Sequence, residues 1–126
     1  MPDYVPKSLA KFNHIPPKRP QHAPHPWSTP FYGQKLQYAT KYLSRPLDKK
    51  GTQRVQDIAG TFLYDGRAVD PTILASLNKI SNKQSAPTTL TETACNQLLD
   101  YLHAYTNAVL RYYASDMILC LVSDAT

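Results

Sequence analysis

A carboxylate stands at the end of the most apolar segment of the chain. Residues Met117 to Val122 are apolar, and Ser123 and Asp124 follow them directly. A buried strand that ends in an aspartate is a common start for a metal-dependent site, because hard divalent cations prefer oxygen ligands. The alternative is an exposed aspartate that ends a strand in a turn. Asp124 is therefore a candidate metal ligand whose partners the rest of the sequence must supply.

Positive charge is concentrated in the first half of the chain. Residues 1–54 contain ten lysines and arginines and two aspartates, a charge of +8, whereas residues 55–126 contain four basic and seven acidic residues, a charge of −3. Aromatic rings are interleaved with these cations, at Trp27, Tyr32, Tyr38 and Tyr42. Cations of this kind release counterions from a nucleic-acid backbone, and rings stack on bases without sequence preference. The candidate nucleic-acid-binding residues are Lys18, Arg19, Lys35, Lys49, Lys50 and Arg54.

The histidines form no recognisable metal-binding pattern. His22 and His25 lie on a proline-rich segment, and neither a cysteine nor an acidic residue is near enough in sequence to complete a four-ligand site. His14 and His103 are isolated in the sequence. A Gly-rich phosphate loop, a GxSxG elbow and a suggestive Cys-His pair are also absent from the sequence.

Composition favours one small intracellular domain. The chain has 126 residues and is 42% hydrophobic, enough for a modest core. It contains no apolar stretch of about 18 residues and no secretory leader at its start, so we expect neither membrane insertion nor export. Cys95 and Cys120 lie in apolar surroundings without CxxC spacing, which predicts reduced core thiols.

The spacing of apolar residues predicts little regular secondary structure in the first half of the chain. Val5, Leu9 and Phe12 have helical spacing and predict a short helix. The prolines between Ile15 and Pro30 remove backbone donors and enforce extended geometry, so we expect an irregular strap over residues 15–30. Residues 31–54 show no clear periodicity and are predicted to be a loop.

The second half has the periodicity of three helices. The apolar positions of the first begin at Val55, and the second is expected to start at Asp70 and Pro71, a capping residue followed by a proline. Thr89 and Glu92 have the spacing of a capping box at the start of the third, which is expected to run about five turns. The apolar positions that define the three are Val55, Ile58, Ala59, Phe62 and Leu63; Ile73, Leu74, Leu77 and Ile80; and Cys95, Leu98, Leu102, Tyr105 and Val109.

The apolar run from Met117 to Val122 is too short for a typical helix and predicts a strand buried on both faces. Such a strand needs partners on both sides, yet the sequence contains no other credible strand of matching character. Nor do other carboxylates lie on strands beside Asp124; they fall in or next to predicted helices, at Asp57, Asp65, Asp70, Glu92, Asp100 and Asp116. The pattern thus indicates an incomplete fragment that could self-associate through its unpaired strand.

Several sequence segments, taken in the order in which they occur, resemble the polyproteins of copia-like LTR retrotransposons. They are "RVQDIAGTFLY", "RAVDPTILASL", "QLLDYLHAYTNAVLRYYASD" and a strand that ends in "SDA". The opening "MPDYVPKSLAKF" with its proline-rich sequel is similar to a family phrase "MPGYV...AL.RF" just past the reverse transcriptase palm. The chain departs from the family at Asp3, where glycine is usual, and at Asp65-Gly66, where an apolar or aromatic continuation is usual and where the helix could be weakened.

The resemblance implies RNA-directed DNA polymerisation and ribonuclease H activity in the parent polyprotein, with Mg²⁺ bound. Asp124 would be the first ribonuclease H carboxylate and a metal ligand, and an RNA/DNA hybrid would be the partner. The polymerase carboxylates of the family precede this region and are not in the chain. We therefore expect the chain alone to be inactive, to bind no cofactor and to have a weak affinity for nucleic acid.

These observations predict a mostly α fold of three to four helices, with an irregular strap and one C-terminal β-strand. The expected divisions are residues 1–54 as the basic end of reverse transcriptase, 55–113 as a helical connection, and 114–126 as the first strand of ribonuclease H. The alternative function is a small helical interaction module whose proline-rich segment binds a partner. In either case we expect an intracellular protein, cytoplasmic or nuclear, without a membrane partner.

Overall fold

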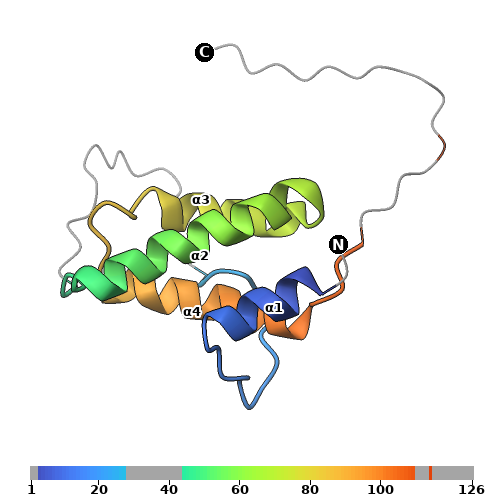
Figure 1. Cartoon of the computed structure of the whole chain (residues 1–126), viewed down its shortest axis with the longest axis horizontal. Helices are drawn as coiled ribbons and strands as arrows, with labels where there is room; N and C mark the ends of the chain where they lie inside the picture. Colours follow the sequence, from blue (N-terminus) through green and yellow to red (C-terminus); the bar gives the residue numbers. More distant parts are fainter. Residues whose placement is uncertain (1–2, 28–43, 110–113, 115–126) are drawn as a thin grey trace, which may run out of the picture.

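In the part of the chain that the structure describes, four α-helices pack side by side (Figure 1). The computed structural model describes residues 3–27, 44–109 and 114. The expectation of a mostly helical fold is confirmed, and no strand forms within this described part. The strand predicted at Met117 to Val122 lies outside the described residues.

Helix α1 spans Tyr4–Lys11 and forms where the spacing of Val5, Leu9 and Phe12 predicts it. All three side chains are buried. Asp3 precedes the helix with φ of 65°, in the left-handed region that favours glycine, and it does not cap the helix with its side chain. Glycine, which stands at this position in the retrotransposon phrase that the opening of the chain resembles, would therefore relieve backbone strain here.

Helix α2 spans Lys49–Ala68, so the predicted loop over residues 31–54 is wrong for residues 49–54. The helix begins six residues before the first apolar position, Val55, because Asp48 caps it. Its carboxylate Oδ1 accepts a hydrogen bond from the Gly51 N–H at 2.7 Å. The first turns face solvent and carry polar residues, so apolar periodicity could not reveal them.

Helix α2 also continues through Asp65 and Gly66, where a weakened helix was expected. Both residues are buried. A β-carbon at position 66 would lie only 3.0 Å from Leu74 Cδ2 and 3.2 Å from Ile73 Cγ1. Glycine at this position lets the end of α2 approach the next helical segment closely.

The start predicted at Asp70 and Pro71 is confirmed. Asp70 Oδ1 accepts a hydrogen bond from the Thr72 N–H at 3.1 Å, and Pro71 occupies the first position of a short 3-10 helix, η1, over Pro71–Ile73. Helix α3, Leu74–Ser81, follows without a break and buries Leu77 and Ile80.

Helix α4 spans Thr89–Ala104, and two details of its prediction are wrong. The capping box consists of Thr88 and Thr91 rather than Thr89 and Glu92, and the Thr88 N–H donates to Thr91 Oγ1 at 3.2 Å. The helix ends at Ala104, so Tyr105 and Val109 continue the apolar spacing without continuing the helix. Tyr105 is 42% exposed and Val109 is 72% exposed, so neither side chain is packed into the core in a way that would extend the helix.

The strap lies across α3 and α4, and two hydrogen bonds attach it there. Ser76 Oγ donates to the Pro24 carbonyl at 2.7 Å, and Gln97 Nε2 donates to the Ala23 carbonyl at 3.1 Å. The strap is irregular, as predicted.

One hydrophobic core joins the described helices. Cys95 is a buried free thiol, as predicted, and burial raises its pKa to about 11, whereas Cys120 lies outside the described residues. The core consists of Val5, Leu9, Phe12, Val55, Ile58, Ala59, Phe62, Ile73, Leu77, Ile80, Cys95, Leu98, Leu99 and Leu102.

The core predicts a large difference between two isoleucine truncations. Ile58 is 0% exposed on α2, whereas Ile15 is 82% exposed after α1. We expect Ile58→Ala to lower the free energy of unfolding by about 2–5 kcal/mol, because it removes buried methyl groups and leaves a cavity. The matched control Ile15→Ala should change it by less than about 0.5 kcal/mol. Urea denaturation followed by circular dichroism measures both, and equal effects would contradict the core described here.

Candidate nucleic-acid interface and two buried acidic sites

Four of the six predicted nucleic-acid-binding residues are exposed to solvent, in two pairs. Lys18 and Arg19 lie on the strap, and Lys49 and Lys50 lie in the first turn of α2. The strap pair is close to the end of α4, since Lys18 and His103 line the same small surface depression. Lys35 lies outside the described residues.

The fifth described candidate, Arg54, has a structural contact. Its side chain is half-buried, and Nη1 donates a hydrogen bond to the Phe12 carbonyl at 2.9 Å, at the end of α1. An arginine at this place offsets the negative end of the α1 dipole and satisfies a carbonyl that the helix leaves unpaired. Its guanidinium therefore holds α1 against α2, and sequence reasoning, which counted only its charge, missed this role.

The N-terminus of α2 concentrates positive potential. Backbone N–H groups at this end give it a partial positive charge, and Lys49 and Lys50 add two full charges there. The first turn contains no acidic residue, and Asp48 at the cap supplies the adjacent negative charge. Cations at this end are unfavourable for an isolated helix, and a bound anion would offset that cost.

Exposed aromatic rings accompany the basic strap. Trp27 is 78% exposed. Tyr105 packs on Tyr101 with ring centroids 4.9 Å apart, and its hydroxyl is 2.6 Å from His22 Nδ1. Tyr101 is half-buried. Tyr32, Tyr38, Tyr42, Tyr112 and Tyr113 lie outside the described residues.

His14, which looks isolated in the sequence, has an acidic partner in the fold. Its Nε2 lies 2.9 Å from Asp100 Oδ1 without the geometry of a hydrogen bond, and the His103 ring is 6.4 Å from its own. Burial lowers the His14 pKa, and this effect outweighs the opposing attraction of Asp100. The contact joins the start of the strap region to α4, and no spacing rule could have found it because 86 positions separate the two residues.

The described acids do not build a metal centre. Within residues 3–27, 44–109 and 114, no group of three His, Cys, Asp or Glu side chains could hold a metal ion. Asp57, Asp65, Asp70, Glu92 and Asp100 lie on helices or at their ends, as the sequence predicted. Asp124 lies outside the described residues.

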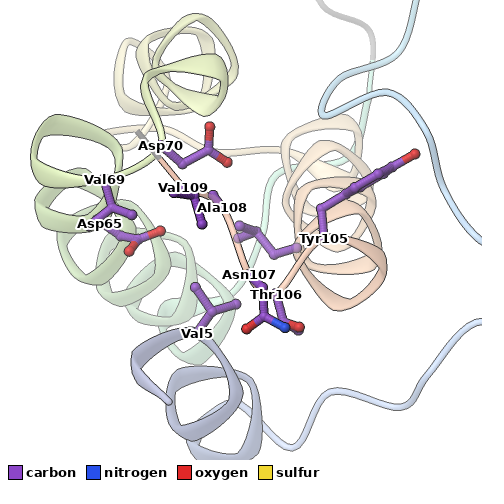
Figure 2. A pocket seen from close by; sticks show the side chains of 10 residues that line it. Val5, Asp65, Val69, Asp70, Tyr105, Thr106, Asn107, Ala108 and Val109 are labelled. Atoms are coloured by element: carbon purple, nitrogen blue, oxygen red, sulfur yellow. The ribbon is translucent and has the colours of Figure 1, made fainter. Parts of the chain in front are cut away.

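Asp65 faces a cavity of about 210 Å³ between the ends of α2 and α4 (Figure 2). It is 3% exposed, and its Oδ2 has no hydrogen-bond partner among the described residues. Burial, with the nearby Asp70 carboxylate, raises the Asp65 pKa. Asp70, by contrast, is satisfied by the Thr72 N–H and hydroxyl. The cavity is lined by Val5, Asp65, Val69, Asp70, Leu102, Tyr105, Thr106, Asn107, Ala108 and Val109.

An acidic side chain fits this position poorly. The retrotransposon phrase that this stretch resembles has an apolar or aromatic residue at this place, and we expect a larger apolar side chain to occupy part of the cavity. A buried carboxylate without a hydrogen bond is destabilising. We therefore interpret the cavity as a packing defect rather than a binding site.

Comparisons with protein-family models, with curated proteins and with solved structures find no match to this chain. None of the helices in the described part is long and apolar enough to cross a bilayer.

The raised pKa of Asp65 predicts a pH dependence of stability. A carboxyl whose pKa is higher in the folded state stabilises the fold below its unfolded pKa of about 3.9, and that contribution is lost as pH rises through the folded pKa. Asp65→Asn resembles the protonated carboxyl, so it should be more stable than the parent chain at pH 7, with a difference that shrinks toward pH 4. Urea denaturation at several pH values measures this difference. Asp57→Asn, on the exposed face of the same helix, is the control, and an equal pH trend in both variants would contradict the assignment.

The cavity predicts that a larger apolar side chain stabilises the protein. Asp65→Leu removes the buried carboxylate and fills part of the space, so we expect a gain of about 1–2 kcal/mol in the free energy of unfolding at pH 7. Thermal denaturation detects it as a higher melting temperature. Asp57→Leu, which adds the same side chain at an exposed site, should give no such gain. A lower melting temperature for Asp65→Leu than for Asp65→Asn would show that the cavity does not accept the leucine.

Proposed function

We propose that this chain is a nucleic-acid-binding fragment of a copia-like retrotransposon polyprotein, from the end of reverse transcriptase into the start of ribonuclease H. The parent would carry out RNA-directed DNA synthesis and hydrolysis of the RNA strand with Mg²⁺. The fragment itself binds an RNA/DNA hybrid weakly and catalyses neither reaction. In the parent, Asp124 would supply the first of the ribonuclease carboxylates that share the metal ions.

The observation that carries the binding proposal is the exposed Lys49-Lys50 pair at the N-terminus of α2, whose two positive charges exceed the single negative charge of Asp48 at the cap. Phosphate oxygens are the anions that such an end attracts, because N–H dipoles and ammonium groups act together there. Lys18 and Arg19 provide a second exposed pair on the strap, whereas the sixth candidate, Lys35, lies outside the described residues. Contacts of this kind bind the backbone and are independent of base sequence.

The two departures from the family pattern support the view of a decayed copy. Asp3 stands at a left-handed φ of 65°, where the family phrase has glycine. Asp65 stands buried where the phrase has an apolar or aromatic residue, and its Oδ2 has no hydrogen-bond partner among the described residues. At both positions the residue of the family phrase suits the local structure better than the residue present, as expected when substitutions accumulate without selection for stability.

The second candidate, an interaction module, is favoured by one observation. Trp27 is 78% exposed at the end of the proline-rich phrase "PQHAPHPW" and could enter an aromatic-lined groove of a partner. However, the strap carbonyls of Ala23 and Pro24 are already bonded to Gln97 and Ser76. A partner would have to accept the strap as it lies on the helices or displace it from them.

Salt dependence tests the nucleic-acid proposal. Binding of the full chain to a labelled RNA/DNA hybrid should weaken steeply as salt rises, with log K falling by about 0.9 per log unit of salt for each phosphate contact. Lys49→Ala/Lys50→Ala should reduce the magnitude of that slope by roughly 2 if both lysines contact phosphates. Filter binding at four salt concentrations measures the slopes.

The matched control is Lys79→Ala/Lys83→Ala, which removes the same charge from α3 and the turn that follows it. The control should bind the hybrid nearly as the parent chain does. Equal losses in both double variants would show a nonspecific charge effect, and binding that is independent of salt would refute the proposal.

A further inference from the structure

His14 joins the start of the strap to α4. Asn13 has a φ of 49°, and the His14 N–H donates to the Leu9 carbonyl at 3.1 Å, so the chain turns away where α1 ends. Ile15, the next residue, is 82% exposed, so apolar packing does not hold the strap at this point. The His14 side chain is only 8% exposed, and its Nε2 lies 2.9 Å from Asp100 Oδ1 on α4. This contact therefore attaches the near end of the strap.

The groups around the His14 ring give little support to a positive charge on it. Asp100 and His103 face the ring from α4, and Arg54 acts on it from α2, where its guanidinium holds the Phe12 carbonyl. His14 Nε2 is buried and has no hydrogen-bond partner among the described residues. Asp100, the single acid among these groups, is itself 29% exposed and is not aligned for a hydrogen bond to His14. The site therefore suits a neutral imidazole better than an imidazolium.

We propose that protonation of His14 releases the strap from α4, so that the strap is attached at neutral pH and detaches as the solution becomes mildly acidic. A buried imidazolium loses most of its hydration, which costs free energy unless well-placed partners replace the water. One partly exposed and misaligned carboxylate does not replace it, and the nearby Arg54 guanidinium repels the charge. In the detached state water surrounds both His14 and Asp100. The detached state therefore binds the proton more tightly, and acid favours detachment.

The direction of the His14 pKa agrees with this geometry. Burial lowers the pKa most, His103 and Arg54 lower it further, and the attraction of Asp100 opposes them without reversing the shift. In the attached state the pKa is therefore below the value of about 6.5 that a histidine has in water. The contribution of His14 to attachment is complete above that value and is lost as pH falls toward the attached-state pKa. Because one proton is exchanged, the attachment constant decreases by at most about tenfold per pH unit in this window.

Detachment at His14 should reach the far end of the strap. The prolines within residues 16–20 restrict the backbone, so this segment behaves as a stiff connection rather than a flexible chain. At the far end, Gln97 Nε2 donates a hydrogen bond to the Ala23 carbonyl at 3.1 Å. Loss of this bond changes the surroundings of the Gln97 side-chain amide, which therefore reports whether the strap is attached.

Nuclear magnetic resonance of the full chain between pH 7.5 and pH 5.0 tests the proposal. The Gln97 side-chain amide signal and the His14 ring signals should move with one common midpoint, below about pH 6.5. In His14→Gln the Gln97 signal should stay in place. The control His22→Gln/His25→Gln removes the other two histidines of the strap and should keep the response of the parent chain. Asp100→Asn removes the attraction that opposes detachment, so it should enlarge the change in the Gln97 signal.

Three results would overturn the proposal: a Gln97 signal that does not move in the parent chain, an equal movement in His14→Gln, or a smaller movement in Asp100→Asn. Circular dichroism at each pH follows the helices. A loss of helical signal with the same midpoint would also overturn it, because protonation would then unfold the helices rather than release the strap. Nucleic acid is absent from this experiment, so this proposal and the proposed function can fail separately.

Discussion

The apolar face of α2 is the surface on which the rest of the fold depends. Val55, Ile58 and Phe62 are 0–1% exposed, and α1, η1, α3 and α4 each pack against this helix. A 20-residue helix with one apolar stripe is not stable alone in water, so burial of that stripe from several sides is the main source of its stability. The polar contacts act where the packing ends. Tyr4 donates its hydroxyl to the Thr61 carbonyl at 2.8 Å, and Arg54 holds the Phe12 carbonyl, so each end of α1 is attached to α2.

The helices could be predicted wherever burial imposes a period on the sequence. Val5 and Leu9, the stripe from Val55 and the Asp70-Pro71 start all appear as expected, because apolar spacing and capping chemistry act locally. The predicted helix bounds were wrong where the apolar spacing of the sequence does not coincide with burial in the fold. The first turns of α2 carry no apolar residue, and Tyr105 and Val109 keep helical spacing after the helix has ended.

Side-chain partners formed by the tertiary fold were beyond sequence reasoning. The basic candidates divide into exposed pairs and one residue, Arg54, whose charge is used inside the molecule, and only coordinates distinguish the two cases. His14 and Asp100 come together from distant parts of the chain. The depression of about 670 Å³ between the strap, α3 and the start of α4 likewise forms only because the strap lies on these helices. Asp65 is a partial exception. The sequence already indicated it as an unusual residue, because the phrase that this stretch resembles has an apolar or aromatic residue there, but the sequence did not show that Asp65 is buried.

The strap closes long loops in the described part of the chain. Its two bonds to the helices join residues 52 and 74 positions apart, so they bring together segments that are remote along the chain. Ordering such long loops costs entropy that only completed helices can offset, and contacts of this separation form slowly. We therefore expect the strap to dock late in folding and to detach early when the helical body loosens. The depression of about 670 Å³ that Pro26 of the strap lines together with α3 and the start of α4 would then form only once the strap has docked.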